Sequence, residues 1–192
     1  MTRPVSIDYD FLNHLVEIKN HKDPYNLILL FFKALEVAPE MHPLVHEREA
    51  RPYMGKLALC LFDSGIISVP ELSAIWRSQP GGQRYYEIMV RKVYKDFMGE
   101  EYPCPRVCID WKTQSSLGEV HTVVMCAFLK QDCFLSDDKR AARDLGKIVR
   151  KILMEPVNIL NRVDCCNYLK QEKRGQHNLT GVELNQLGHK LT

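Results

Sequence analysis

The chain has 192 residues, of which 45% are hydrophobic and 26% are charged, and its formal net charge is +2. This length suits one domain with a substantial core, and the composition excludes a disordered or fibrous protein. A charge so close to neutral neither requires nor excludes a polyanionic partner, since a local basic face can bind nucleic acid on a neutral protein.

The first half of the chain alternates short apolar runs with helical patterns. Val5–Ile7 predicts a strand that ends at Asp8 and leads directly into a helix. Tyr25–Val37 predicts a strongly apolar helix that begins after Pro24 and is ended by Pro39. A turn and a short helix are predicted over residues 41–49, and further helices over 57–62, from 70 onward, and over 85–98, with a compact β-branched run at Ile66–Val69.

The second half continues the alternation. Residues 99–117 have the composition of a loop, and a helix is predicted from Gly118 to Lys130. A buried strand follows at Cys133–Leu135 and stops at Ser136-Asp137-Asp138. A helix over 139–154, a strand over 156–160 and a helix over 163–170 complete the pattern. Alternating strands and helices predict an α/β fold, a three-layer α/β/α sandwich with a mainly parallel central sheet.

The domain organisation predicted from this pattern is simple. We expect one domain over residues 1–171 and a polar C-terminal tail over residues 172–192. Within that tail, Thr180 and Glu183 have the spacing of a capping box for a short helix. The segment from Pro70 to Leu117 matches no motif and is predicted to shape a substrate groove or a dimer face.

Nothing in the sequence predicts export or membrane insertion. The N-terminus reaches Asp8 before a long apolar run forms, and the longest apolar stretch, Leu27–Phe32, is far too short to cross a bilayer. The seven cysteines are odd in number and scattered, which favours reduced thiols. We therefore expect a cytoplasmic protein with no membrane partner.

Acidic residues fall where predicted strands end. Asp8 follows the first strand, and Asp137 and Asp138 follow the strand at 133–135. The carboxyl ends of parallel strands meet at one edge of a sheet, which is where open α/β sheets place their ligands. Glu119 at a helix start and Glu49 after a proline-marked turn are predicted to reach the same edge. Glu47 competes with Glu49, which is preferred on spacing alone.

Such a group of carboxylates predicts a divalent cation. Buried carboxylates repel one another unless positive charge is present, and Mg²⁺ or Mn²⁺ with oxygen ligands supplies it. A bound ion of this kind can activate water and stabilise the oxygens of a phosphoryl displacement. The structural alternative is that Asp8 and the Asp137-Asp138 pair only cap the helices that follow them.

Four short motifs in this order resemble the acidic motifs of PIN domains. They are Asp8 with Phe11-Leu12, Val45-His46-Glu47-Arg48-Glu49, Leu117-Gly118-Glu119-Val120-His121, and Phe134-Leu135-Ser136-Asp137-Asp138-Lys139 with Arg143. The resemblance covers roughly Val5 to Leu169. PIN domains are commonly metal-dependent ribonucleases, often toxins paired with antitoxins, and some are inactive scaffolds.

The resemblance implies a role for each acid. Asp8 would be the central metal ligand, Glu119 the third acid, and Asp138 a ligand within the Ser/Thr-x-Asp signature, with Asp137 as an alternative ligand. Glu49 would orient water or a second ion. His121 stands where many members of the family carry a further acid, a departure that weakens the negative charge of the site.

Substrate contacts are predicted on the helix after Asp138. Its basic residues, Arg140, Arg143, Lys147, Arg150 and Lys151, share one face. This face is either a solvated surface or a track for phosphates, and Arg140 and Arg143 lie nearest the acids. His121 is predicted to donate to a phosphate, to tune Glu119, or to be a hydrogen-bonded histidine on a helix surface.

The function predicted from these motifs is a metal-dependent endoribonuclease of PIN type, acting on single-stranded RNA and toxin-like in its biology. The alternative is a catalytically weak or inactive PIN-like module that binds RNA or a protein partner. A third class, a homodimer or antitoxin-bound element, would use an exposed part of the apolar helix at Tyr25–Val37.

Overall fold

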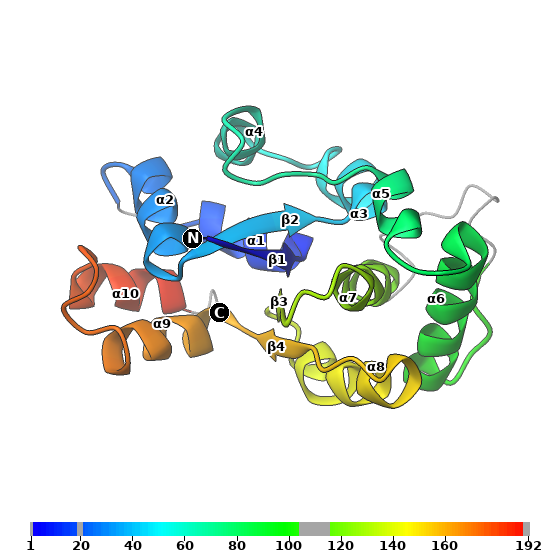
Figure 1. The fold of residues 1–192 in the computed structure, drawn as a ribbon. Helices are drawn as coiled ribbons and strands as arrows, with labels where there is room; N and C mark the ends of the chain where they lie inside the picture. Colours follow the sequence, from blue (N-terminus) through cyan, green and yellow to red (C-terminus); the bar gives the residue numbers. More distant parts are fainter. Residues whose placement is uncertain (1, 19–20, 104–115, 190–192) are drawn as a thin grey trace.

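The computed structural model describes residues 2–18, 21–103 and 116–189. These residues form a parallel sheet with helices on both faces, so the predicted three-layer α/β/α sandwich is confirmed (Figure 1). The strands, in the sheet order β2-β1-β3-β4, are β1 (Arg3–Ile7), β2 (Val37–Met41), β3 (Cys133–Leu135) and β4 (Asn158–Leu160). The helices are α1 (Tyr9–Val16), α2 (Pro24–Ala34), α3 (Pro43–Val45), α4 (Lys56–Asp63), α5 (Leu72–Arg77), α6 (Gly82–Met98), α7 (Leu117–Phe128), α8 (Gly146–Leu153), α9 (Arg162–Gln171) and α10 (Gly181–Gly188), with π-helical turns η1 (His46–Ala50) and η2 (Ala141–Leu145).

The two faces of the sheet pack against different sets of helices. Successive side chains on a strand point to opposite faces, so Cys133 and Leu135 enter one core and Phe134 enters the other. The first core is closed mainly by α1, α2, α4, α9 and α10, and the second by α5, α6, α7 and α8. Both sides of the central strands are therefore buried, as expected for an all-parallel sheet.

Strand β2 is where the sequence prediction was wrong. The helix expected to reach Val37 ends at Ala34, and Glu36, with a φ of 58°, turns the chain into β2. Pro39 was interpreted as a helix stop but lies inside this strand, which pairs with β1 alone among the named strands. A proline has no N–H for the ladder, and a strand at the edge of the sheet can accommodate that loss.

The parallel arrangement brings the ends of the central strands together. Ile7 pairs with Leu135, and the Asp8 N–H donates to the Leu135 carbonyl over 3.1 Å. The chain leaves β1 and β3 at the same edge of the sheet, so Asp8 and Ser136 follow adjacent strand ends. Side chains 128 residues or more apart in sequence thus share one edge.

The C-terminal segment is packed into the protein. The expected capping box is present, with Thr180 and Glu183 bonded reciprocally at the start of α10. Helix α10 packs against α9 and buries Leu184 and Leu187 in the first core. In the described ranges, no helix combines the length and apolar character needed to span a bilayer.

Candidate functional site

Asp8 is the most deeply buried carboxylate at the edge where the strands end. It is only 4% exposed. Its Oδ1 accepts the Phe11 N–H over 2.7 Å, so Asp8 caps α1 as the structural alternative predicted. Its other oxygen, Oδ2, is buried without a hydrogen-bond partner of adequate geometry among the described residues. Burial raises the pKa of Asp8 well above its ordinary value, although the nearby Ser136 hydroxyl offsets part of the rise. Capping of α1 therefore uses only one of the two carboxylate oxygens of Asp8, Oδ1.

Glu119 and Glu49 lie next to each other at the start of α7. Burial, and then the negative charge of Glu119, raises the pKa of Glu49 to about 8. Burial raises the pKa of Glu119 to about 7, and the charges of Asp138 and Asp10 contribute to the rise. The structure therefore brings Asp8, Glu49 and Asp138 each within electrostatic range of Glu119.

Gly118 permits the close approach of Glu49 to α7. A Cβ added at Gly118 would lie 2.5 Å from Glu49 Oε2 and 2.6 Å from Oε1. The Gly118 N–H also bonds to Glu49 and lowers its pKa against the larger effect of burial. The glycine thus fixes Glu49 at the positive end of a helix, where a carboxylate is favoured.

Asp10 is a member of the group that the sequence did not reveal. It lies in the first turn of α1, and its charge raises the pKa of Asp8, Glu49 and Glu119. Its own pKa is raised by burial, an effect that His14 opposes. The only signal in the sequence was its spacing two residues after Asp8. We call Asp8, Asp10, Glu49, Glu119 and Asp138 the acidic cluster.

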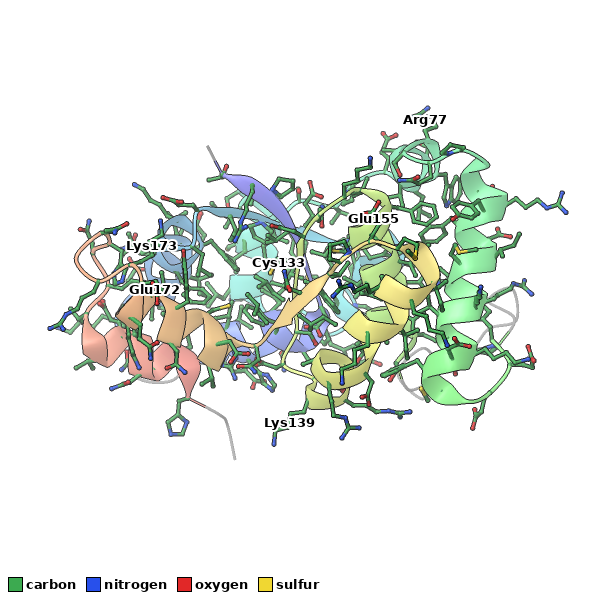
Figure 2. The ribbon with its side chains drawn as sticks, turned by 60° about the horizontal axis from the view of Figure 1, so that its bottom comes forward. Arg77, Cys133, Lys139, Glu155, Glu172 and Lys173 are labelled. Atoms are coloured by element: carbon green, nitrogen blue, oxygen red, sulfur yellow. The ribbon has the colours of Figure 1, made fainter. Side chains whose placement is uncertain are left out.

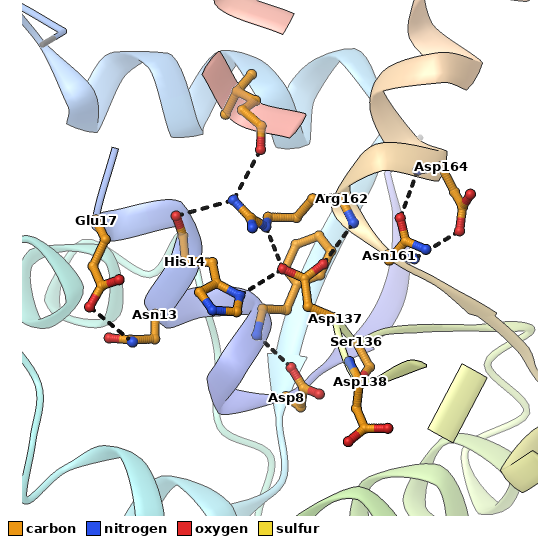
Figure 3. Close-up of polar contacts among 12 residues, drawn as sticks. Asp8, Asn13, His14, Glu17, Ser136, Asp137, Asp138, Asn161, Arg162 and Asp164 are labelled. Carbon is orange, nitrogen blue, oxygen red and sulfur yellow. Dashed lines mark hydrogen bonds and ion pairs between the residues drawn. The ribbon is translucent and has the colours of Figure 1, made fainter. Parts of the chain in front are cut away.

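Asp137 and Asp138 are neighbours with different surroundings (Figure 3). Asp138 caps the helix that follows: its Oδ1 accepts the Ala141 N–H over 2.6 Å, and its own N–H donates to Ser136 Oγ over 3.1 Å. Asp137 instead points toward Arg162 and His14. The structure therefore joins Asp138 to the acidic cluster and engages Asp137 elsewhere.

Asp137 is held in what we call the Arg162 clasp, made of Arg162, Asp137 and His14. The Arg162 N–H donates to Oδ1 over 3.0 Å, while Arg162 Nε and His14 Nδ1 reach Oδ2 over 2.5 and 2.8 Å. Arg162 is 3% exposed and also donates to the carbonyls of His14 and Leu187. Both oxygens of Asp137 are thus occupied by partners from α1 and α9, and the same arginine ties α10 to them.

His121 is buried rather than on a helix surface, so that interpretation was wrong. It is 5% exposed, and burial lowers its pKa to about 3. Its Nδ1 lies 3.0 Å from the Tyr86 hydroxyl and its Nε2 lies 2.8 Å from the Tyr102 hydroxyl. Both ring nitrogens are therefore engaged inside the protein, and neither is placed to contact a phosphate.

Tyr86 extends this network to His42. The Leu44 N–H donates to His42 Nδ1, which requires the proton of the neutral ring to be on Nε2, 2.8 Å from the Tyr86 hydroxyl. Tyr86 can then donate to His121 Nδ1, leaving His121 Nε2–H to donate to Tyr102. The network joins α3, which leads to Glu49, with α7, which carries Glu119.

The two arginines predicted to steer a substrate have partners within the chain. Arg140 donates to the Phe97 carbonyl over 2.9 Å and lies 4.6 Å from the centroid of the Phe97 ring. Arg143 pairs with Asp144 over 2.8 Å on the exposed surface. Arg140 is therefore directed toward α6 and Arg143 toward its own neighbour. Their predicted role in substrate binding stays a prediction.

The acidic cluster fits a hard divalent cation by its chemistry. Its donors are carboxylate oxygens, the ligands that Mg²⁺ and Mn²⁺ prefer, and Asp8 Oδ2 is buried and forms no hydrogen bond of ordinary geometry with a described residue. Over the described residues, no three His, Cys, Asp or Glu side chains lie close enough together to hold a metal ion. Coordination of an ion by three of these side chains would therefore require them to move closer together.

The acidic cluster has no ion pair with a basic side chain that the structure describes. Within the described part of the chain, no Lys or Arg forms an ion pair with any member of the acidic cluster. The five carboxylates come from β1–α1, η1, α7 and the end of β3, and they are linked through their electrostatic effects on one another's pKa. No family model, curated protein or solved structure matches the chain, so its membership of the PIN family stays a prediction from the motifs.

Proposed function

We propose that this protein is a metal-dependent endoribonuclease of PIN type that uses the acidic cluster to hydrolyse RNA phosphodiester bonds. The observation that carries the proposal is the buried, unpartnered Oδ2 of Asp8 among carboxylates whose pKa values burial raises. Perturbed carboxylates of this kind concentrate at functional sites. The choice of RNA as substrate rests on the resemblance of the motifs to PIN domains.

Each member of the cluster has a distinct part in the proposal. Asp8, Glu119 and Asp138 would hold Mg²⁺ or Mn²⁺, which supplies an activated water and charge stabilisation at the phosphate. Glu49, fixed beside Gly118, would orient that water or take its proton, a role that suits a carboxyl with a pKa of about 8. Asp10 adds negative charge at the rim. Asp137 has no part, because the Arg162 clasp occupies it.

A second candidate is a catalytically weak or inactive PIN-like module that binds RNA or a protein. The observation in its favour concerns the three predicted substrate contacts. His121 is buried in the tyrosine network, Arg140 is bonded to Phe97, and Arg143 is paired with Asp144. Hydrolysis without these contacts would depend on the acidic cluster alone for positioning the substrate.

A cleavage assay separates the two candidates. Labelled single-stranded RNA of mixed sequence is incubated with the protein and Mn²⁺ or Mg²⁺, and fragments are resolved over time. Asp8→Asn keeps an oxygen that can cap α1 but loses the charge, so cleavage should fall by at least about a hundredfold. Asp132→Asn, which changes an exposed acid at the other end of β3, is the matched control and should cleave normally.

The outcomes bear directly on the proposal. Cleavage by the wild type and by Asp132→Asn, with loss in Asp8→Asn, would support catalysis by the acidic cluster. Equal cleavage by the wild type and Asp8→Asn would exclude it, because the activity would then come from elsewhere or from a contaminant. RNA binding without cleavage in the wild type would favour the second candidate.

A further inference from the structure

A groove of about 320 Å³ runs along the sheet edge formed by β4, away from the acidic cluster. Strand β4 is last in the sheet order, and Figure 2 shows this side of the molecule turned forward. One wall of the groove is β4 with the residues before it, and the other is the face of η2 and α8. Its lining residues are Ala142, Arg143, Gly146, Lys147, Arg150, Pro156, Val157, Asn158, Ile159 and Leu160.

The backbone of β4 offers a free hydrogen-bonding position in this groove. The Asn158 N–H donates to the Asp132 carbonyl, and the Leu160 carbonyl accepts the Ser136 N–H. Both residues thus use their backbone groups toward β3. Backbone groups alternate in direction along a strand, so the N–H and carbonyl of Ile159 point outward. An extended chain laid along this edge would meet one donor and one acceptor at Ile159.

The opposite wall of the groove is basic. Arg143, Lys147 and Arg150 follow one another at helical spacing along the same face. Arg143 is paired with Asp144, so Lys147 and Arg150 supply the positive charge that faces the groove. Of the residues that the structure describes, no acidic side chain lines the groove, and the acids nearest in sequence, Asp144 and Glu155, are outside it. Gly146 keeps this wall close to the strand, since a Cβ there would lie 3.0 Å from the Val157 carbonyl.

The lining favours a peptide over a nucleic acid. Proteins bind single-stranded nucleic acid by combining cations with aromatic rings on which bases stack. Among the described residues no aromatic side chain lines this groove, and its apolar part consists of aliphatic side chains such as Val157 and Ile159. Aliphatic side chains beside an open strand edge are the features that bind an extended peptide by strand addition.

We propose that this groove binds an acidic, extended peptide segment of a partner protein, which pairs with β4 at Ile159 and places its carboxylates against Lys147 and Arg150. The backbone contact sets the register of the peptide, and the basic wall selects its charge. Opposite charge across such a contact contributes to specificity and association rate more than to affinity. This site is separate from the acidic cluster and does not depend on the proposed hydrolysis.

Fluorescence anisotropy with a labelled peptide of alternating Glu and Val tests the proposal. The wild type should bind it, and a peptide of alternating Lys and Val should not bind. The double variant Lys147→Glu with Arg150→Glu should weaken binding at least about tenfold. The matched control is Arg84→Glu with Lys92→Glu, two exposed cations on α6, which should bind as the wild type does.

Ile159→Pro probes the strand edge separately from the charges. Proline removes only an N–H that points away from β3, so the ladder with β3 is kept while binding of the acidic peptide falls. Circular dichroism confirms that each variant is folded. Asp8→Asn should bind the peptide normally, which separates this result from the outcome of the cleavage assay.

Two results would overturn the proposal. One is the absence of binding of the Glu-Val peptide to the wild type. The other is binding that the double variant at Lys147 and Arg150 does not change. If a single-stranded RNA oligonucleotide displaces the peptide and loses its own binding in the same double variant, the groove is a nucleic-acid track and the peptide assignment is wrong.

Discussion

Asp137 and Asp138 are consecutive, yet they belong to two regions built in opposite ways. The Arg162 clasp surrounds Asp137 with a buried guanidinium, a backbone N–H and a histidine nitrogen. The acidic cluster gathers five carboxylates, including Asp138, without an ion pair to any Lys or Arg that the structure describes. Both oxygens of Asp137 thus have hydrogen-bond partners, whereas Asp8 Oδ2 has none of ordinary geometry among the described residues.

The difference between these regions separates stability from function. A buried carboxylate with a complete set of partners holds structural elements together, and here α1, α9 and α10 meet at Arg162. Carboxylates kept together without a cation cost stability, and such a cost persists where function requires it. We therefore assign the Arg162 clasp to folding, and the proposed hydrolysis would use the acidic cluster.

The largest expected effect is on the clasp. Arg162→Met should lower the free energy of unfolding by about 3–5 kcal/mol, because it leaves Asp137, whose side chain is 12% exposed, without the guanidinium and removes the bonds to two carbonyls. Urea unfolding followed by circular dichroism measures this change. Arg143→Met, which breaks the exposed pair with Asp144, is the control and should unfold as the wild type does. Equal effects of the two substitutions would remove the structural role of the clasp.

The next largest effect is a change in stability with pH that comes from the acidic cluster. The pKa of Glu119 is about 7 and that of Glu49 about 8, against an ordinary value of 4.5. The folded protein then keeps protons that the unfolded chain has lost, so the free energy of unfolding falls as pH rises from about 4.5 to 8. With divalent ions chelated, unfolding at pH 6.5 and 8.5 should show this fall.

Glu49→Gln removes one of these charges and should reduce the fall by about 1–2 kcal/mol, since one pKa unit corresponds to about 1.4 kcal/mol. Glu47→Gln, an exposed position in the same turn η1, is the matched control and should keep the wild-type slope. A wild-type pH dependence in which stability rises over this range, or one that Glu49→Gln leaves unchanged, would contradict the raised pKa values that burial, and then the neighbouring carboxylates, give to Glu49 and Glu119.

A smaller effect is expected at Gly118. In Gly118→Ala the new Cβ would overlap the Glu49 carboxylate, which is the mobile end of a side chain and can move aside. The fold should therefore be kept, while the affinity for Mn²⁺ falls about tenfold because an acid near the ion is displaced. Calorimetric titration with Mn²⁺ measures the affinity. Gly55→Ala, where a Cβ meets no atom within 4 Å, is the control.

The sequence predicted the framework of the site better than its contacts. The boundaries of β3 were predicted from a short apolar run with polar residues before and after it. The parallel pairing of β1 and β3 then places Asp8 and Asp138 at the same edge of the sheet. Strand β2 was missed because Pro39 signals a helix end as readily as an edge strand. Local patterns indicate elements, and the edge position of a strand is a property of the whole sheet.

The contacts and burial of single polar residues depend on partners that are distant in sequence. Asp137 is occupied because Arg162 reaches it from α9, and His121 is buried because Tyr86 of α6 bonds to it. Neither partner could be assigned from spacing. Asp10 resembled an ordinary acid in the first turn of a helix, and only the convergence of α1, η1 and α7 places its charge beside the other acids.

The most direct test of the central claim is calorimetric titration of the wild type and Asp8→Asn with Mn²⁺ near neutral pH. The wild type should bind the ion, and Asp8→Asn should bind at least about tenfold more weakly, because the buried Oδ2 of Asp8 is the acceptor that the cluster leaves free. Asp132→Asn, at the opposite end of β3, should retain the wild-type affinity. Equal affinity in all three proteins, or no binding to the wild type, would contradict a divalent-cation site in the acidic cluster.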